Sequence, residues 1–170
     1  MKRVPSQTGR ELPSGFRVGH WADRAAWTGC TVVLPPRGNV AACEIRGGGP
    51  GTRETDLLSP AASVEEIHGV LLTGGSAFGL GAADGVASYL AEQGIGLETP
   101  AAVVPLVSAS VVYDLSLGKA DVYPDASAGF AACSAAGAKV DRGSVGVGIG
   151  CTVGKLHGTA AWTKGGVGLA

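Results

Sequence analysis

The residues that could do chemistry are concentrated first in positions 72–93, LTGGSAFGLGAADGVASYLAEQ. An apolar segment runs there through Gly74 and Gly75 into Ser76 and then into a helical pattern. A nucleophile elbow, G-x-S-x-G, occupies such a strand-to-helix turn, but Phe78 stands where its second glycine should be. The pattern therefore favours a helix-capping or substrate-binding Ser76, with a Ser76-based α/β-hydrolase as the weaker alternative.

The same turn does not match a nucleotide-binding loop. Asp84 stands where G-x-G-x-x-G needs its third glycine, and a carboxylate there would repel a pyrophosphate. A glycine turn at the start of a helix nevertheless presents backbone N–H groups that can hold an anion, a carbonyl or an oxyanion. The sequence therefore predicts a backbone-lined binding turn.

Two further side chains could act beside such a turn. Tyr113, in SASVVYDL, either donates a hydrogen bond to a reacting oxygen or is a buried tyrosine with a satisfied hydroxyl. Lys155, in GCTVGKLHG, is either a solvated turn lysine or a partly buried amine that lowers the pKa of a nucleophile. Lys164 is a weaker candidate for the same role.

Composition argues against several classes of function. The net charge of −1 leaves no basic surplus to neutralise phosphates, so no nucleic-acid partner is expected. The apolar run AAVVPLVSASVVY is too short to span a bilayer, and the N-terminus has no apolar leader segment, so a cytoplasmic protein without membrane contact is expected. The four cysteines form no CxxC pair and lie at no metal-ligand spacing from histidine, so buried free thiols and no metal are expected.

The elements that must position these residues follow from turns and periodicity. Glycine supplies 29 of 170 residues, against a usual share of about 7 %, which indicates tight turns and close backbone approach. Strands are predicted over 16–21, 30–35, 40–47, 69–74 and 144–156, with strand character also in 103–115 and 158–163. Helices are predicted from 77 to about 94 and after 125. Residues 1–14 are expected to be a flexible arm.

Six motifs together resemble one family. They are GCTVVLPP, RGGGPGTRETDLL, VLLTGGSAFGLGAADGV, SASVVYDL, YPDASAGFAAC and VGVGIGCTVGK. In this order they are similar to the L-aminopeptidase/D-esterase family of N-terminal-nucleophile-type hydrolases, which includes β-peptidyl aminopeptidases and nylon-oligomer hydrolases. The resemblance extends from about Gly15 to Ala170.

The resemblance implies an α/β fold, a four-layer α/β/β/α sandwich, of which residues 15–170 would be the N-terminal part of a single hydrolase domain. Such proteins cut themselves before a Ser or Thr, whose freed α-amine activates its own hydroxyl. The two product chains stay together, the assembly is a homo-oligomer, and no cofactor is used.

The resemblance also assigns roles to residues of this sequence. Tyr113 would stand next to the nucleophile and Lys155 beside the cleavage centre. The substrate pocket would be lined by Gly74, Gly75, Ser76 and Phe78. The nucleophile itself would lie in a later segment or second chain that these 170 residues do not contain. The chain alone is therefore expected to be inactive.

The leading expectation is an amide hydrolase that acts on small peptides or amide oligomers by acyl transfer to that terminal Ser or Thr. The alternative is a truncated or degenerate relative that serves as an assembly module or a small-ligand-binding module without catalysis.

Overall fold

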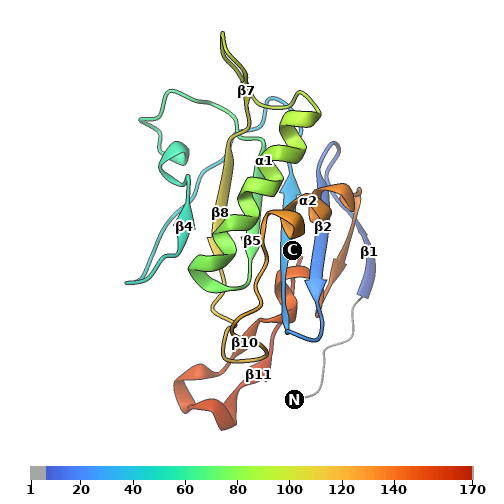
Figure 1. Cartoon of the computed structure of the whole chain (residues 1–170), viewed down its shortest axis with the longest axis vertical. Helices are drawn as coiled ribbons and strands as arrows, with labels where there is room; N and C mark the ends of the chain where they lie inside the picture. The colour runs from blue at the N-terminus through green and yellow to red at the C-terminus, as the bar shows by residue number, and fades with distance from the viewer. Residues whose placement is uncertain (1–6, 170) are drawn as a thin grey trace.

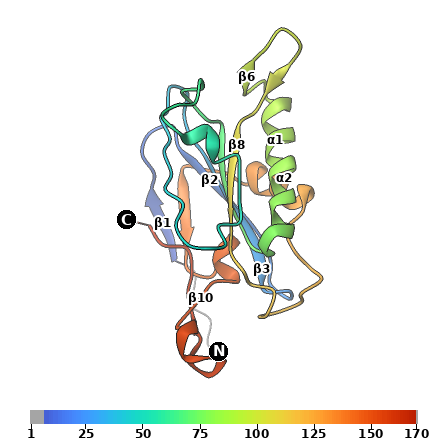
Figure 2. The same cartoon turned by 90° about the vertical axis from the view of Figure 1, so that its left-hand side faces the viewer.

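A five-stranded sheet with two helices on one face organises the chain (Figures 1 and 2). The computed structural model describes residues 7–169. The sheet order is β2 (Arg17–Asp23), β3 (Thr28–Leu34), β5 (Gly69–Thr73), β8 (Val107–Val111) and β4 (Thr52–Arg53). Neighbouring strands are antiparallel except β5 and β8, which are parallel. The expected α/β class is therefore confirmed.

The core lies between this sheet and the helices α1 (Ala82–Glu92) and α2 (Ala126–Ser134). Alternate residues of β3 face the helices, and with Leu71 they form a fully buried apolar layer against Val86 and Leu90 of α1. The two helices approach very closely, because a Cβ added at Gly85 would lie 1.7 Å from the Ala126 carbonyl oxygen. Small residues in these helices are thus a packing requirement.

The opposite face of the sheet is less covered. Leu72 points away from the helices and is 40 % exposed. The described residues thus supply one helical layer and one main sheet of the four layers that the resemblance implies. Three short pairs accompany them: β1 (Gln7–Glu11) with β9 (Lys139–Arg142), β6 (Leu97–Glu98) with β7 (Val103–Val104), and β10 (Thr152–Val153) with β11 (Thr163–Lys164).

A flexible arm is expected over residues 1–14, but the described part of this segment contains a strand. Residues 7–11 form β1, which pairs antiparallel with β9. The pairing partner lies more than a hundred residues away, so local composition could not reveal it. Residues 1–6 are outside the described part of the chain.

The expected strand over 40–47 is also wrong. The segment is irregular and largely exposed, with Val40 at 88 % and Ile45 at 46 %. The edge of β3 that it would have occupied is taken by β5. Tertiary pairing therefore overrides the local apolar pattern.

Residues 144–156 form mainly short 3₁₀ turns, η3 (Gly146–Ile149) and η4 (Lys155–His157), and β10 is their only strand. Gly146 has φ of 47°, and a Cβ there would lie 2.3 Å from Thr31 Oγ1. The alternating glycines thus serve close contact with β3. Val153 of β10 pairs with Thr163 of β11 across η4 and a further turn, η5 (Thr159–Ala161).

Two remaining short turns complete the chain. η1 (Asp56–Leu58) follows β4, and η2 (Ser76–Gly81) connects β5 to α1, so the expected helix from residue 77 begins as a 3₁₀ helix.

No helix within residues 7–169 is both long and apolar enough to cross a membrane.

Candidate active site

The parallel pairing of β5 and β8 brings two of the predicted site segments together. Both strands end at the same edge of the sheet, so the turn after Thr73 meets the segment after Val111. The Val112 N–H donates to the Thr73 carbonyl oxygen at 2.8 Å, and the Ser76 N–H donates to the Val112 carbonyl oxygen at 3.1 Å. Tyr113 therefore stands beside the glycine turn.

The buried Asp114 carboxylate holds the glycine turn in place through hydrogen bonds. The residue is 3 % exposed, and Oδ1 accepts the Gly75 N–H at 2.7 Å while Oδ2 accepts the Thr28 hydroxyl at 2.8 Å. A Cβ at Gly74 would lie 2.1 Å from Oδ2, so only glycine fits there. The sequence analysis missed Asp114, although a carboxylate three residues after the end of a strand with a buried first half is a recognisable signal.

The predicted role of the turn's backbone needs correction. The Gly75 and Ser76 N–H groups are taken by Asp114 and Val112, so neither is free to hold an anion or an oxyanion. Their hydrogen bonds fix the turn itself. The two N–H groups therefore serve the structure of the turn, whereas those of Ala77 and Phe78 stand at the start of η2.

Ser76 is held in an unusual backbone conformation and caps no helix. Its φ is 53°, in the left-handed region that residues with a Cβ rarely adopt. The N-cap of η2 is Gly75, that of α1 is Gly81, and neither helix has a side-chain cap. No histidine within residues 7–169 forms a hydrogen bond with the Ser76 hydroxyl, which argues against the triad alternative.

Aromatic side chains surround the turn. The Phe78 ring is 62 % exposed and stacks on Tyr123, with ring centroids 5.0 Å apart and an interplanar angle of 18°. Tyr123 lies directly against the turn, because a Cβ at Gly75 would be 2.4 Å from Tyr123 Cβ. Tyr113 is 59 % exposed, so the buried-tyrosine interpretation is wrong. Tyr123 escaped the sequence analysis because its position depends on a long loop.

Lys155 lies on the hairpin of β10 and β11, which projects beyond the lower end of the sheet in Figure 1. Its side chain is exposed, and Nζ stands 5.8 Å from the centre of the Trp162 ring. The partly buried amine suggested by the sequence is therefore not found at Lys155.

Lys164 is the buried ammonium of this region. It is 6 % exposed, and Nζ donates to the carbonyl oxygens of Gly165 at 2.7 Å, Cys151 at 3.1 Å and Gly148. Burial lowers the pKa of Lys164. A Cβ at Gly150 would lie 2.3 Å from Asp114 Oδ2, so the segment that Lys164 holds packs on the turn's anchor.

Three of the four cysteines are withdrawn from solvent, which makes their thiols poor nucleophiles. Burial raises the pKa of Cys151, whose thiol donates to the Val147 carbonyl oxygen, and raises those of Cys30 and Cys133 to about 12. All four cysteines are free, but Cys43 is exposed, contrary to expectation. Among residues 7–169, no group of His, Cys, Asp or Glu gathers in a way that could hold a metal ion.

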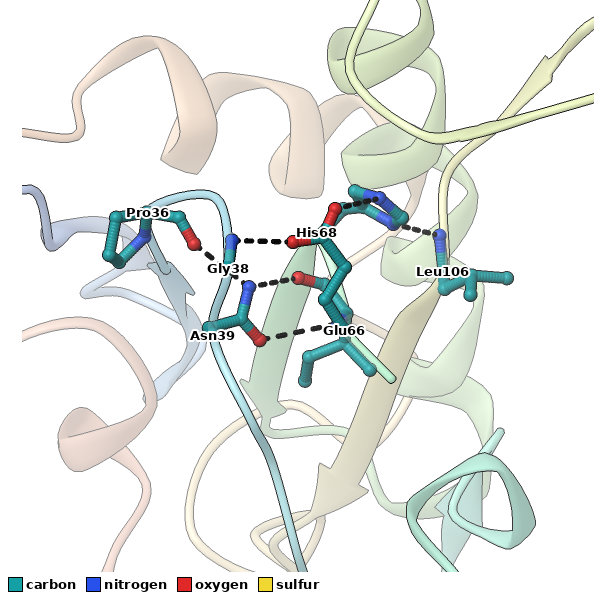
Figure 3. A network of polar contacts seen from close by, with 7 residues as sticks. Pro36, Gly38, Asn39, Glu66, His68 and Leu106 are labelled. Carbon is teal, nitrogen blue, oxygen red and sulfur yellow. Dashed lines mark hydrogen bonds and ion pairs between the residues drawn. The ribbon is translucent and has the colours of Figure 1, made fainter. Parts of the chain in front are cut away.

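A second polar region lies at the opposite end of β5, beside a cavity of about 310 Å³ (Figure 3). Asn39 donates to the Pro36 and Ile67 carbonyl oxygens, both at 2.9 Å, and accepts the Ile67 N–H at 3.3 Å. The Gly38 N–H donates to Glu66 at 2.6 Å. These contacts tie the turn after β3 to the start of β5.

His68 completes this second region. It is 8 % exposed, and its Nδ1 accepts the Leu106 N–H at 3.0 Å, which leaves the proton of the neutral ring on Nε2, facing Glu66 Oε1 at 3.9 Å. Burial lowers the pKa of His68; Glu66 opposes this shift and Arg37 adds to it. The Asn39 amide and the His68 Nδ1 are bound by the protein itself, so these groups link the turn after β3 and the start of β8 to β5.

Comparison with known proteins identifies similar chains. Residues 14–170 match peptidase family S58. An uncharacterized aminopeptidase from Mycobacterium tuberculosis (strain ATCC 25618 / H37Rv) is 49 % identical over 164 residues, which cover 92 % of this chain and 46 % of that protein. A 6-aminohexanoate-oligomer endohydrolase from Agromyces sp. (strain KY5R) is 32 % identical over 154 residues, which cover 88 % of this chain and 41 % of that protein.

A solved structure has a similar fold. The beta-aminopeptidase from Burkholderia sp. superposes with a TM-score of 0.57 at 20 % sequence identity, over 88 % of this chain and 45 % of that chain. The chain thus spans about half the length of the curated relatives that it matches.

Proposed function

Because the chain belongs to peptidase family S58, a hydrolase family, we propose that it is part of an amide-bond hydrolase that acts on small peptides or amide oligomers. The names of the similar proteins, an aminopeptidase and an amide-oligomer hydrolase, support this class of substrate. One observation in the structure carries the proposal: the exposed Tyr113 phenol stands beside a turn that the buried Asp114 carboxylate holds in place.

The proposed reaction is acyl transfer to a terminal Ser or Thr that self-cleavage frees and that lies outside residues 1–170. Its hydroxyl attacks the amide carbonyl carbon, and its α-amine takes the proton and passes it to the leaving nitrogen as the C–N bond breaks. Water then hydrolyses the ester and restores the hydroxyl. Tyr113 donates a hydrogen bond to the carbonyl oxygen as negative charge develops on it.

The remaining site residues have supporting roles in this proposal. Gly74 and Gly75 shape the turn, Ser76 sets its direction, and Phe78 contacts the substrate. The Lys155 ammonium adds positive charge beside the cleavage centre, where it favours the unprotonated α-amine. The assembly is proposed to be a homo-oligomer with no cofactor, and its cytoplasmic location stays a prediction.

The first experiment is the intact mass and N-terminal sequence of every chain in the native particle. A second chain that begins with Ser or Thr supports self-processing and names the nucleophile. A single 16.8 kDa species would favour the alternative, a non-catalytic assembly or ligand-binding module. The size of the native particle by light scattering tests the homo-oligomer.

The role of Tyr113 is tested in the processed protein by Tyr113→Phe. One lost hydrogen bond to the developing oxyanion predicts a kcat about 100-fold lower with an unchanged KM for an aminoacyl anilide. Tyr89→Phe is the matched control, because Tyr89 packs between the two helices. Equal kcat values for both variants would remove Tyr113 from the mechanism.

A further inference from the structure

An exposed aromatic wall stands beside the glycine turn. It consists of Phe78 and Tyr123, stacked at 5.0 Å and exposed by 62 % and 38 %. The sequence has only three Phe, three Tyr and three Trp. The exposed aromatic side chains of residues 11–169 are these two and Tyr113, which lies beside the same turn. Exposed aromatic surface is therefore concentrated where the proposed chemistry occurs.

The wall is fixed from both sides. Tyr123 lies against Gly75, whose N–H is bound by Asp114, and it is followed by the fully buried Pro124. Phe78 belongs to η2, which the left-handed Ser76 starts. Both rings are thus attached to rigid segments, and a ligand that covers them loses little entropy in ordering them.

The chemistry of the wall favours an aliphatic ligand over a cation. Ring faces can bind either apolar groups or ammonium groups. A free carboxylate would favour an ammonium, but both oxygens of Asp114 are engaged, by Gly75 and by Thr28. The rings therefore offer apolar contact without a neighbouring free charge from the turn's own anchor.

We propose that Phe78 and Tyr123 form a specificity-determining wall that binds the aliphatic side chain or methylene chain of the amide substrate. The inference rests on the proposed function for the identity of the substrate. It assigns Tyr123, together with Phe78, to substrate selection and leaves the chemical step to other residues.

The test uses the processed full-length protein and anilides of alanine, 2-aminobutyrate, norvaline and norleucine, which differ by one methylene each. Each methylene that the wall buries raises kcat/KM about fourfold. In Phe78→Ala and Tyr123→Ala the increase falls below about twofold per methylene. Tyr123→Phe keeps the ring and keeps the increase. An unchanged increase in both Ala variants would overturn the proposal.

The matched control is the other aromatic pair of the described residues, Tyr89 and Phe130, with centroids 5.4 Å apart between α1 and α2. Phe130→Ala lowers the unfolding temperature but leaves the dependence on chain length unchanged. The same flattening in this control would show a general loss of structure and contradict a specific wall.

A binding experiment separates the wall from the proposed function. Straight-chain amides from acetamide to hexanamide are titrated while the NMR signals of the Phe78 and Tyr123 rings are followed. Affinity that grows with chain length in the wild type, but not in Phe78→Ala, supports the wall even if no anilide is hydrolysed. In that case the proposed function fails alone. Affinity independent of length in the wild type overturns the wall.

Discussion

The two ends of β5 carry two polar networks with different consequences. At its amino end, Asn39 and Glu66 link the turn after β3 to the start of β5, and His68 accepts the Leu106 N–H before β8. At its carboxyl end, Asp114 binds the glycine turn, and exposed aromatic rings stand around it. The comparison teaches that a buried network marks a site only where it holds exposed, strained or reactive groups in position.

The largest expected difference between the two ends is in the free energy of unfolding. Asp114→Ala leaves the Gly75 N–H and the Thr28 hydroxyl buried without a partner, so it costs about 3 kcal/mol or more. Glu66→Ala at the other end costs about 1 kcal/mol, because its side chain is 38 % exposed. Urea unfolding of both variants measures this. Equal losses would mean that the two networks are equivalent.

The next largest effect is the loss of stability when either of two lysines near the carboxyl end of β5 is replaced. Lys164→Met leaves three carbonyl oxygens, one buried and two partly buried, without their shared donor and costs about 2 kcal/mol. Lys155→Met removes an exposed contact with Trp162 and costs about 0.5 kcal/mol. Thermal unfolding distinguishes the two. A larger loss in Lys155→Met would contradict the assignment of Lys164 as the buried ammonium.

The strained backbone at the carboxyl end predicts a stabilising change. Ser76→Gly relieves a left-handed conformation, which outweighs the added freedom of the unfolded chain and stabilises the protein by about 0.5 kcal/mol. Asn39→Gly at the other end is the contrast, because it removes three hydrogen bonds. A calorimetric Tm that falls in Ser76→Gly would show that the Ser76 side chain makes a stabilising contact.

The smallest expected effect is the pH dependence of folding stability that His68 causes at the amino end of β5. The folded-state pKa of His68 is lowered, so the unfolded chain binds more protons as the pH falls below the ordinary value of 6.5. Stability therefore decreases between pH 6.5 and the lowered pKa. His68→Asn keeps an acceptor for the Leu106 N–H and makes this decrease smaller. A residual decrease comes from the partly buried His20, whose pKa is also lowered. Urea unfolding at pH 7.5 and pH 5 measures the loss of stability in the wild type and in His68→Asn. An equal loss in both proteins would contradict the role of His68.

Much of the site was visible in local patterns. The apolar run before Gly74, the change of period after Ser76, and the glycines of the two helices predicted β5, the turn and the close helix packing, because each depends on neighbouring residues. Asp125 before a small-residue segment likewise predicted α2, and its carboxylate does cap that helix.

Other features depended on partners far along the chain. The strand at 7–11 exists because β9 pairs with it, and 40–47 is irregular because β5 occupies the edge of β3. Lys164, not Lys155, is buried because the turn that contains Gly148 and Cys151 packs against it and accepts hydrogen bonds from its Nζ. Local composition has no access to such contacts.

The sequence by itself determined the glycine turn, the small-residue helices, the α/β class and, through its motifs, the hydrolase family. Only the tertiary structure decided that Asp114 occupies the turn's amides and that Tyr123 joins Phe78 beside them. The physical reason is that turn and helix preferences are properties of short segments. Burial, pairing and hydrogen-bond satisfaction are instead decided by which distant segments the sheet brings to the same edge.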